Sequence, residues 1–285
     1  MIYLFTALYS EASVFIKRFH LTKNQTRTKF QEFYNEEAGI RLTVTGVGEI
    51  AAAAAVSDVC STYQPTEKDL LLNVGTCART DDGGIFLCNK ITELATGKTF
   101  YPDLLFRHDF EEAEILTGMC PLDQDSDEKR SLIYSDGTLY DMEAAAVYQA
   151  GSYDFGPHQM VFLKLVSDRG NAKETSREQI EQLMDVYADR LYAFVEQLSH
   201  ISSRQAKSAD GRSEQMEMLT DKLCEDLHCS KVMGDLLRQY IRYCMLSGVD
   251  VKAVVSDMYA DKKLPCKDKK EGKQRFEELK RRLFE

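Results

Sequence analysis

Apolar and polar residues follow two alternating patterns from the N-terminus to about residue 200. Short apolar runs typical of buried strands occur at residues 2–8 (IYLFTAL), 69–75 (DLLLNVG) and 160–168 (MVFLKLVSD). Residues 83–94 predict further strands, and residues 30–48 predict a hairpin-like pair of strands around Gly39. These segments together predict a sheet of several strands.

Segments between these runs carry apolar residues on one helical face. They are residues 11–19 (EASVFIKRF), 49–63 (EIAAAAAVSDVCSTY) and 176–198 (SREQIEQLMDVYADRLYAFVEQL). We expect the last segment to form one long helix that closes the domain. The alternation of strands and helices predicts the α/β class, as a three-layer α/β/α sandwich whose mixed sheet is largely parallel.

The pattern changes to helices alone after a polar stretch at residues 200–215 (HISSRQAKSADGRSEQ). Four candidate helices follow, which are enough for a small helical bundle. We therefore expect a catalytic α/β domain over residues 1–203, a linker over 204–215 and a small all-α domain of unknown role over 216–285. A possible task for these helices is to contact a protein partner.

The charge changes at the same place. Residues 1–204 carry 19 Lys and Arg against 31 Asp and Glu, whereas residues 205–285 carry 17 against 15. The formal net charge of −10 argues against a general nucleic-acid binder. No apolar run approaches the roughly 18–20 residues of a membrane span. The apolar N-terminus lacks a preceding basic segment, so no signal peptide is expected. Eight cysteines without CxxC pairs are typical of reduced thiols, which favours a cytoplasmic protein.

Candidate catalytic side chains follow the predicted strands. Glu11 comes after the first strand, Asn73–Thr76 ends the second, and Ser167–Asp168 ends the last. Glu143 begins the alanine-rich run YDMEAAAVYQA (residues 140–150), where an ionised side chain needs partners if it is buried. Because the carboxyl ends of parallel strands line one crevice, these groups are expected to share a pocket. Several carboxylates and a hydroxyl suit general acid and base catalysis on a polyhydroxylated substrate.

Five motifs in order resemble one family over roughly residues 1–200. They are TALYSEA (6–12), TGVGEIAAA (45–53), NVGTCA (73–78), YDMEAAAVYQ (140–149) and LVSD (165–168). The chain resembles the nucleoside phosphorylase superfamily, and most of all its 5′-methylthioadenosine/S-adenosylhomocysteine nucleosidases. The resemblance implies hydrolysis of the N-glycosidic bond of a purine nucleoside or 5′-thionucleoside, with no cofactor and no metal. It also implies a homodimer.

The resemblance implies a role for each site residue. Asp168 is expected to be the general acid toward purine N7, and Glu11 to activate the attacking water. The remaining predicted residues bind the nucleoside: Thr76 positions the water, Glu143 accepts ribose hydroxyls, Met142 packs on the sugar, Ser167 accompanies Asp168, and Phe100 lies in the aromatic-rich segment 96–108 on the 5′ side. Carboxylates near the sugar stabilise an oxocarbenium-like transition state.

Hydrolysis is favoured over phosphorolysis. The phosphorylases resemble RVGT at the third motif, where an arginine grips phosphate, but this chain has Asn73 there. Other departures concern the base. Pro121 stands where the nucleosidases have an aromatic residue, and Arg79 where they have a small one. Residues 123–130 (DQDSDEKR) resemble a solvated loop. The helical residues 205–285 have no counterpart in the family.

Alternative interpretations remain open. Glu143 and Glu11 could be helix-start charges, and Asp168 an ordinary turn or N-cap residue. Residues 46–51 (GVGEIA) fit GxGxxA, a weak dinucleotide-binding signal, although a tight strand–helix turn explains the glycines. Cys77 and the Cys224–His228 pair are better explained by packing than as a nucleophile and a metal site. Phosphorolysis on the same fold, or a non-catalytic nucleoside-binding domain that signals through the C-terminal helices, are the alternative functions.

Overall fold

The computed structural model describes residues 1–79, 83–121, 137–170, 175–209, 212–247 and 249–284. They form two compact units, Met1–Gln205 and Ala206–Glu285. No helix in these ranges is both long and apolar enough to cross a membrane.

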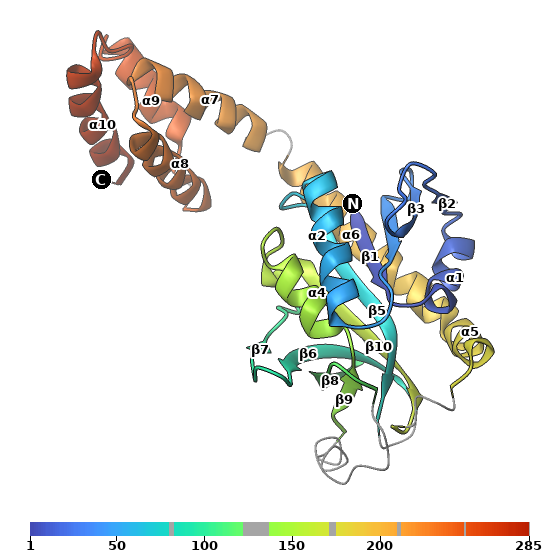
Figure 1. The fold of residues 1–285 in the computed structure, drawn as a ribbon. Helices are drawn as coiled ribbons and strands as arrows, with labels where there is room; N and C mark the ends of the chain where they lie inside the picture. The colour runs from blue at the N-terminus through green and yellow to red at the C-terminus, as the bar shows by residue number, and fades with distance from the viewer. Residues whose placement is uncertain (80–82, 122–136, 171–174, 210–211, 248, 285) are drawn as a thin grey trace. The chain divides into compact units, whose positions relative to one another are not determined.

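The first unit is built on one mixed sheet with helices on both faces (Figure 1). Its strands are β1 (Ile2–Thr6), β2 (Thr22–Lys23), β3 (Gln31–Asn35), β4 (Ile40–Val44), β5 (Leu70–Ala78), β6 (Ile85–Glu93), β7 (Thr99–Phe100), β8 (Glu111–Thr117), β9 (Leu139–Asp141) and β10 (Met160–Asp168). The order is β10-β6-β8-β9-β5-β1-β4-β3-β2, with β7 beside β6. Strands β4, β1, β5 and β10 run parallel to their neighbours in this group, and β3 and β4 form the predicted antiparallel hairpin.

One end of the sheet closes on itself. Strand β10 pairs with β6, and β6, β8, β9 and β5 follow in order until β5 pairs with β10 again. Because β9 runs antiparallel to β5, with Tyr140 opposite Ala78, it returns the chain to the edge where β5 ends. This closure brings the start of the YDMEAAAVYQA run to the carboxyl ends of β5 and β10.

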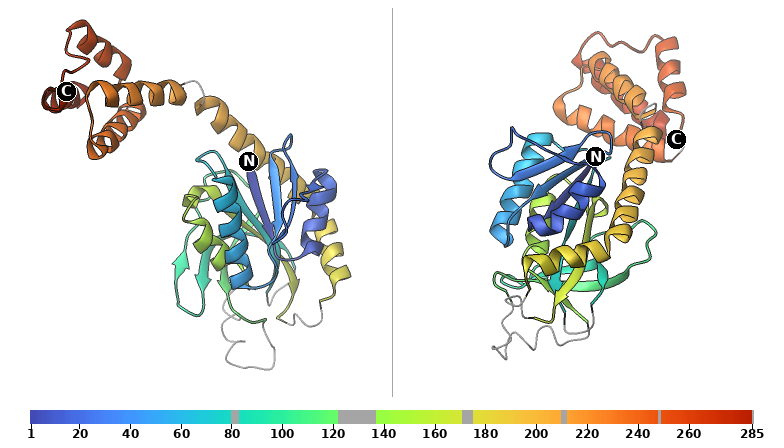
Figure 2. Two further views of the ribbon diagram at one scale, coloured as in Figure 1. Left: turned by 45° about the horizontal axis from the view of Figure 1, so that its top comes forward. Right: turned by 90° about the vertical axis from the view of Figure 1, so that its right-hand side faces the viewer.

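Side chains of the central strands alternate between two cores. In β1, Ile2 and Leu4 enter one core, whereas Tyr3 and Phe5 enter the other. The first core is covered by α1 (Tyr9–Arg18), α5 (Arg177–Val186) and α6 (Ala188–Ala209), and the second by α2 (Glu49–Tyr63) and α4 (Ala144–Gly151). A short 3₁₀ helix, η1 (Pro157–Gln159), precedes β10. The predicted three-layer arrangement is confirmed, and Figure 2 shows both helical layers against the sheet.

The predicted long helix over residues 176–198 is two helices in the structure. Helix α5 ends at Val186 and α6 begins at Ala188, so Tyr187 interrupts them. The buried residues of the two helices nevertheless continue one spacing: Ile180, Met184, Ala188, Leu191, Val195 and Leu198. This continuous apolar face explains why the sequence pattern predicts a single helix.

The predicted linker is mostly helical. Helix α6 extends to Ala209 and α7 (Arg212–Asp226) begins three residues later, so residues 204–209 and 212–215 are not an extended connection. The stretch is polar, but it contains no proline and a single glycine, Gly211, so its composition is compatible with helix. Polarity alone did not distinguish a linker from a solvated helix.

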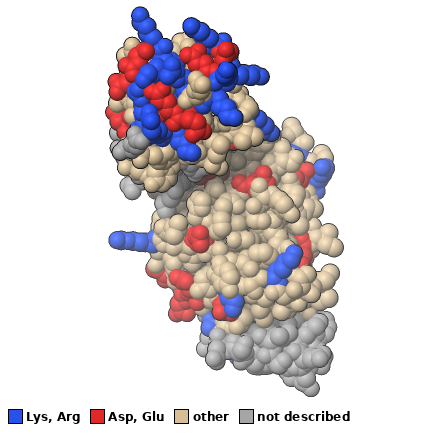
Figure 3. Space-filling view, turned by 90° about the vertical axis from the view of Figure 1, so that its left-hand side faces the viewer, with Lys and Arg blue, Asp and Glu red and all other residues tan. Residues whose placement is uncertain are grey.

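The second unit consists of helices, as the sequence predicts. After α7 come α8 (Lys231–Leu246), α9 (Val251–Ala260) and α10 (Lys269–Phe284). They share a separate apolar core that includes Leu223, Leu237, Val255 and Leu279. Lys, Arg, Asp and Glu side chains crowd the surface of this unit in the upper part of Figure 3, whereas the face of the first unit shown there is largely uncharged. A core of its own indicates that the second unit is a folded module.

Candidate active site

A pocket with a volume of about 260 Å³ lies at the carboxyl ends of the parallel strands. Strands β1, β5 and β10 end there, and their registers place Asp168 beside Ala78. The lining residues are Ala7, Leu8, Glu11, Val47, Thr76, Cys77, Ala78, Pro121, Tyr140, Asp141, Met142, Glu143, Ser167, Asp168, Thr175 and Ile180. Every charged side chain among these is acidic.

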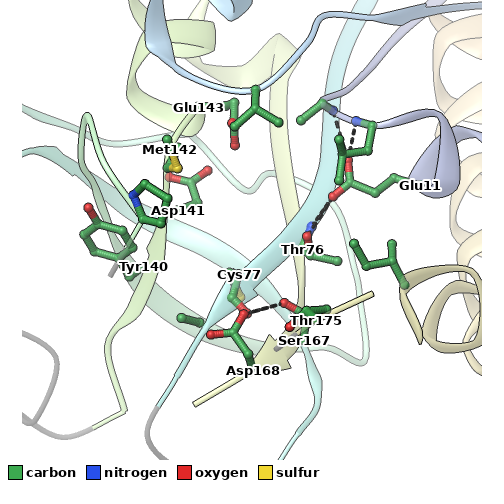
Figure 4. Close-up of a pocket in the computed structure, with 16 residues that line it drawn as sticks. Glu11, Thr76, Cys77, Tyr140, Asp141, Met142, Glu143, Ser167, Asp168 and Thr175 are labelled. Carbon is green, nitrogen blue, oxygen red and sulfur yellow. Dashed lines mark hydrogen bonds between the residues drawn. The ribbon is translucent and has the colours of Figure 1, made fainter. Parts of the chain in front are cut away.

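Six of the seven predicted site residues are brought together here: Glu11, Thr76, Met142, Glu143, Ser167 and Asp168. Figure 4 shows them around the cavity, with Glu11 and Glu143 on the upper side and Asp168 below. The structure does not bring Phe100 to this pocket. Phe100 lies on β7 and stacks on Tyr148, with 4.9 Å between the ring centroids.

Both carboxylate oxygens of Glu11 accept hydrogen bonds from the protein. Its side chain is held at the first turn of α1, and the residue is 2% exposed. Oε2 accepts hydrogen bonds from the backbone N–H groups of Ala7 and Leu8, at 3.0 Å each. Oε1 accepts from the backbone N and the hydroxyl of Thr76, at 2.7 and 2.8 Å. Four donors match the lone pairs of one carboxylate, so Glu11 links β1, α1 and β5.

Glu143 is buried, and among the described residues one donor, Gly48 N, bonds to its carboxylate. It immediately precedes α4, but its side chain does not cap that helix. Instead Oε1 accepts a hydrogen bond from Gly48 N at 2.7 Å. Burial and the neighbouring Asp141 carboxylate raise the pKa of Glu143 from 4.5 to about 7, although Lys164 and the Gly48 N–H lower it. A helix-start role therefore does not account for this side chain, because it is directed across to the α2 turn.

The Gly48 N–H explains the GVGEIA motif. Gly46 and Gly48 both have positive φ, +86° and +98°, in the turn between β4 and α2. Residues other than glycine rarely adopt a backbone conformation with positive φ. The turn therefore requires both glycines. The N–H that a dinucleotide phosphate would use already binds the Glu143 carboxylate. The structure thus favours the turn over the dinucleotide hypothesis.

Asp168 ends β10 at the opposite side of the pocket. Its Oδ2 accepts a hydrogen bond from the Ser167 hydroxyl at 2.8 Å, and its Oδ1 accepts from Gly170 N at 2.9 Å. The Ser167 hydroxyl also lies 3.3 Å from the Cys77 carbonyl. These contacts orient the Asp168 carboxyl within the turn and keep it on the pocket lining.

The residues predicted around the base have defined places. Pro121 lines the pocket, and so does Tyr140, whose hydroxyl donates to the Cys120 carbonyl at 2.5 Å. The Arg79 guanidinium lies over the Phe86 ring, 4.3 Å from its centroid. Residues 123–130 lie outside the described residues. Cys77 lines the pocket, but burial raises the pKa of its thiol well above the ordinary value, which argues against a nucleophile.

Sequence reasoning missed Asp141 and Lys164. Asp141 lines the pocket beside Glu143, and its Oδ2 lies 2.8 Å from Lys164 Nζ in an ion pair whose side chains are 0% and 1% exposed. The sequence does hold a signal, because Lys164 is the single cation within the apolar run MVFLKLV. A lysine in the middle of a buried strand requires an anionic partner.

Comparison with solved structures finds the same fold in nucleosidases. A Helicobacter pylori 5′-methylthioadenosine/S-adenosyl homocysteine nucleosidase matches with a TM-score of 0.54 and 12% identity, over 69% of this chain and 97% of that chain. The corresponding Campylobacter jejuni enzyme gives 0.53 and 15%, again over 69% and 97%. A Helicobacter pylori futalosine hydrolase gives 0.54 and 12%, over 69% and 97%. No family model and no curated protein sequence matches the chain. At these identities the likeness shows that the first unit has the same fold as these nucleosidases.

Proposed function

We propose that this protein hydrolyses the N-glycosidic bond of a purine nucleoside or 5′-thionucleoside and releases the free base. The observation that carries this proposal is the convergence of Glu11, Thr76, Glu143 and Asp168, from separate segments, on one pocket. The fold shared with known nucleosidases supports it. The chemistry needs no cofactor, because acid, base and electrostatic stabilisation suffice to break this bond.

At the base end, Asp168 protonates or hydrogen-bonds purine N7 as the base leaves. Ser167 supports this step, since its hydroxyl is 2.8 Å from Asp168 Oδ2 and fixes the carboxyl. At the sugar end, Glu143 accepts hydrogen bonds from ribose hydroxyls and Met142 packs on the ring. Within the described ranges, Gly48 N is the one donor to Glu143, which leaves acceptor positions for these hydroxyls. Negative charge beside the sugar stabilises the oxocarbenium-like transition state.

The attacking water binds between Glu11 and Thr76 in this mechanism. The Thr76 hydroxyl donates to Glu11 Oε1, so its own oxygen is available to accept a hydrogen bond from water. Glu11 already accepts four hydrogen bonds. The proton of the water therefore reaches Glu11 through the Thr76 hydroxyl, or after water displaces that hydroxyl.

The acidic lining favours water over phosphate as the nucleophile. Among the described residues the lining has four acidic side chains and no Lys or Arg, so it offers no cation to hold phosphate. Asn73, at the position of the phosphate-gripping arginine, is 3% exposed and donates to the Phe5 carbonyl at 3.2 Å, outside the lining. Phosphorolysis on this fold is the alternative that these contacts disfavour.

The test is release of free base from a nucleoside panel, with and without phosphate. The panel contains methylthioadenosine, S-adenosylhomocysteine, futalosine, adenosine and inosine, followed by chromatography. Release without phosphate is expected. Asp168→Asn should lower kcat about 10²–10⁴-fold while nucleoside binding persists. Asp189→Asn, at an exposed carboxylate paired with Arg18, is the control and should leave kcat unchanged.

A requirement for phosphate would replace hydrolysis by phosphorolysis. Binding of a nucleoside without any turnover would favour a non-catalytic domain that signals through the helical unit. A homodimer is part of the proposal. Its support is a set of large apolar side chains exposed on the first unit, including Ile50 (81%), Leu105 (80%) and Tyr153 (90%).

A further inference from the structure

Lys164 is a buried cation beneath the pocket. It lies in the middle of β10, and its Nζ is 2.8 Å from Asp141 Oδ2. Burial lowers the pKa of Lys164, but the carboxylates of Asp141 and Glu143 outweigh it and raise that pKa above the ordinary value. The ion pair with Asp141 therefore favours the charged form of the lysine. A buried ammonium group needs opposite charges and hydrogen-bond acceptors around it to offset the loss of hydration.

Asp141 connects this cation to the start of α4. Its Oδ2 also accepts a hydrogen bond from Ala144 N at 2.9 Å, and its Oδ1 accepts from the Thr117 hydroxyl at 2.7 Å. The Thr117 oxygen in turn accepts from Ala145 N at 3.0 Å. Two of the first N–H groups of α4 are thus satisfied by β8 and β9. Glu143, the residue before α4, is placed by this network.

Lys164 also borders the other glutamate of the pocket. A Cβ atom added at Gly75 would lie 3.3 Å from Glu11 Oε1 and 3.6 Å from Lys164 Nζ. Glycine at this position of β5 therefore lets the ammonium group and the Glu11 carboxylate approach the same point. Three carboxylates, those of Glu11, Asp141 and Glu143, surround one buried ammonium.

Other titratable groups around this cluster do not replace the lysine. Glu49 on α2 faces Asp141, and burial, Glu93 and Asp141 raise its pKa. The thiols of Cys77 on β5 and Cys88 on β6 face Lys164, and burial raises the pKa of each thiol. Tyr140 faces Asp141, and burial raises its pKa to about 12. These groups are neutral or acidic, so Lys164 is the cation that offsets Asp141.

We propose that Lys164, through its ion pair with Asp141, is a positioning residue that holds Glu143 in place and in the ionised form that accepts the ribose hydroxyls. The inference rests on the proposed function of the site. Without Lys164, the carboxylates of Asp141 and Glu143 would share a buried space with no compensating charge. One of them would then take up a proton, and the acceptor for the sugar would be lost.

The test uses two substitutions with opposite expected effects on the acid limb of the pH profile of kcat/KM. Lys164→Gln retains a donor to Asp141 but removes the cation. We expect it to move the limb to higher pH by about one unit, so that kcat/KM falls about fivefold at pH 7 and recovers at pH 9. Asp141→Asn removes the neighbouring anion and keeps an acceptor for Ala144 N. We expect it to move the limb to lower pH.

Controls separate charge from general destabilisation. Lys164→Arg keeps the charge, so the acid limb of its kcat/KM profile should lie at the same pH as in the unsubstituted protein. Arg41→Gln removes the cation of another buried pair, Arg41–Glu32 at 2.9 Å in β4 and β3. It should lower stability and leave the limb in place. Equal losses of kcat/KM at all pH values in Lys164→Gln and Asp141→Asn would overturn the proposal, as would shifts in the same direction.

A second measurement does not depend on turnover. The carboxyl carbon of Glu143 can be titrated by NMR in protein labelled with ¹³C-glutamate and assigned through Glu143→Gln. Its apparent pKa should rise in Lys164→Gln and fall in Asp141→Asn. If the protein releases no base but these titrations shift as expected, the proposed function fails and the role of Lys164 stands. If base is released but the titrations do not shift, only the role of Lys164 fails.

Discussion

The two glutamates of the pocket are buried to similar extents, but the protein satisfies them differently. Glu11 is 2% exposed and accepts four hydrogen bonds from described residues, whereas Glu143 is 8% exposed and accepts one from them. Burying a carboxylate costs free energy that hydrogen bonds must offset. At Glu11, hydrogen bonds from the protein offset this cost. At Glu143 they offset only part of it, and the pKa rises to about 7.

The difference indicates separate roles for the α1 and α4 sides of the pocket. The α1 side is part of the scaffold, since Glu11 fastens the β1–α1 turn to β5. On the α4 side, the part of the chain that the structure describes gives Glu143 one donor, Gly48 N, which leaves acceptor positions for the ribose of the proposed substrate. Strained or incompletely satisfied groups are typical of functional sites. The same chemical substitution at the two positions should therefore have opposite effects on stability.

Glu11→Gln should produce the largest change in stability. Each carboxylate oxygen accepts two donors, so an NH₂ group in place of either oxygen leaves two donors without an acceptor. Each such loss costs roughly 1–3 kcal/mol. The free energy of unfolding, measured by urea denaturation at pH 7, should fall by about 2–6 kcal/mol. Glu181→Gln, at an exposed pair with Arg177, is the control and should change it little. A loss below about 0.5 kcal/mol at Glu11 would contradict the scaffold role.

Glu143→Gln should instead stabilise the protein at high pH. The raised pKa means that the folded chain binds a proton more tightly than the unfolded chain. The stabilising contribution of the protonated form is complete below the ordinary pKa of 4.5. It is lost as the pH rises through about 7. At pH 8 the unsubstituted protein carries the full cost of an ionised Glu143, about 3 kcal/mol, which glutamine removes.

This expectation is checked by urea denaturation of both proteins at pH 4 and pH 8. The stabilisation by Glu143→Gln should be present at pH 8 and absent at pH 4, because glutamine and protonated glutamate make the same bond to Gly48 N. The KM for a nucleoside should rise at the same time, since an amide is a poorer acceptor for ribose hydroxyls. Equal stability changes at the two pH values would mean that Glu143 does not titrate as inferred.

The sequence predicted much of this site because its residues follow local signals. Glu11, Thr76 and Asp168 come directly after or at the ends of apolar runs, and parallel strands bring such ends together. Glu143 was identified as a charge in a run suited to burial. The hydrogen bonds that distinguish Glu11 from Glu143 were not predictable. They depend on contacts between residues far apart in the chain, such as Gly48 with Glu143.

The features that local sequence patterns do not predict also depend on contacts between distant residues. Lys164 and Asp141 meet because β10 and β9 both lie beside β5, and this closure of the sheet has no counterpart in local periodicity. The aromatic content of its segment predicts that Phe100 binds the nucleoside, and the stacking of Phe100 on Tyr148 is a contact that the segment alone does not predict. The break at Tyr187 lies within an unbroken apolar spacing. Local pattern specified elements and candidate groups, whereas long-range pairing decided which groups meet.

The smallest expected effect tests how the Glu11 side of the pocket divides its hydrogen bonds. Thr76→Val preserves the shape of the side chain and removes one of the four donors to Glu11, while the Thr76 backbone N still donates to Oε1. The free energy of unfolding should fall by about 0.5–1.5 kcal/mol. In Thr76→Ser, which keeps the hydroxyl, the free energy of unfolding should fall by less.

The kinetics of the two variants separate a structural from a catalytic role of this hydroxyl. If the hydroxyl only holds Glu11 in place, its removal changes stability and leaves kcat nearly unchanged. A tenfold or larger loss of kcat in Thr76→Val, with kcat retained in Thr76→Ser, would place the attacking water at this hydroxyl. Glu11 would then act on the water through the same bond that fastens it to the scaffold.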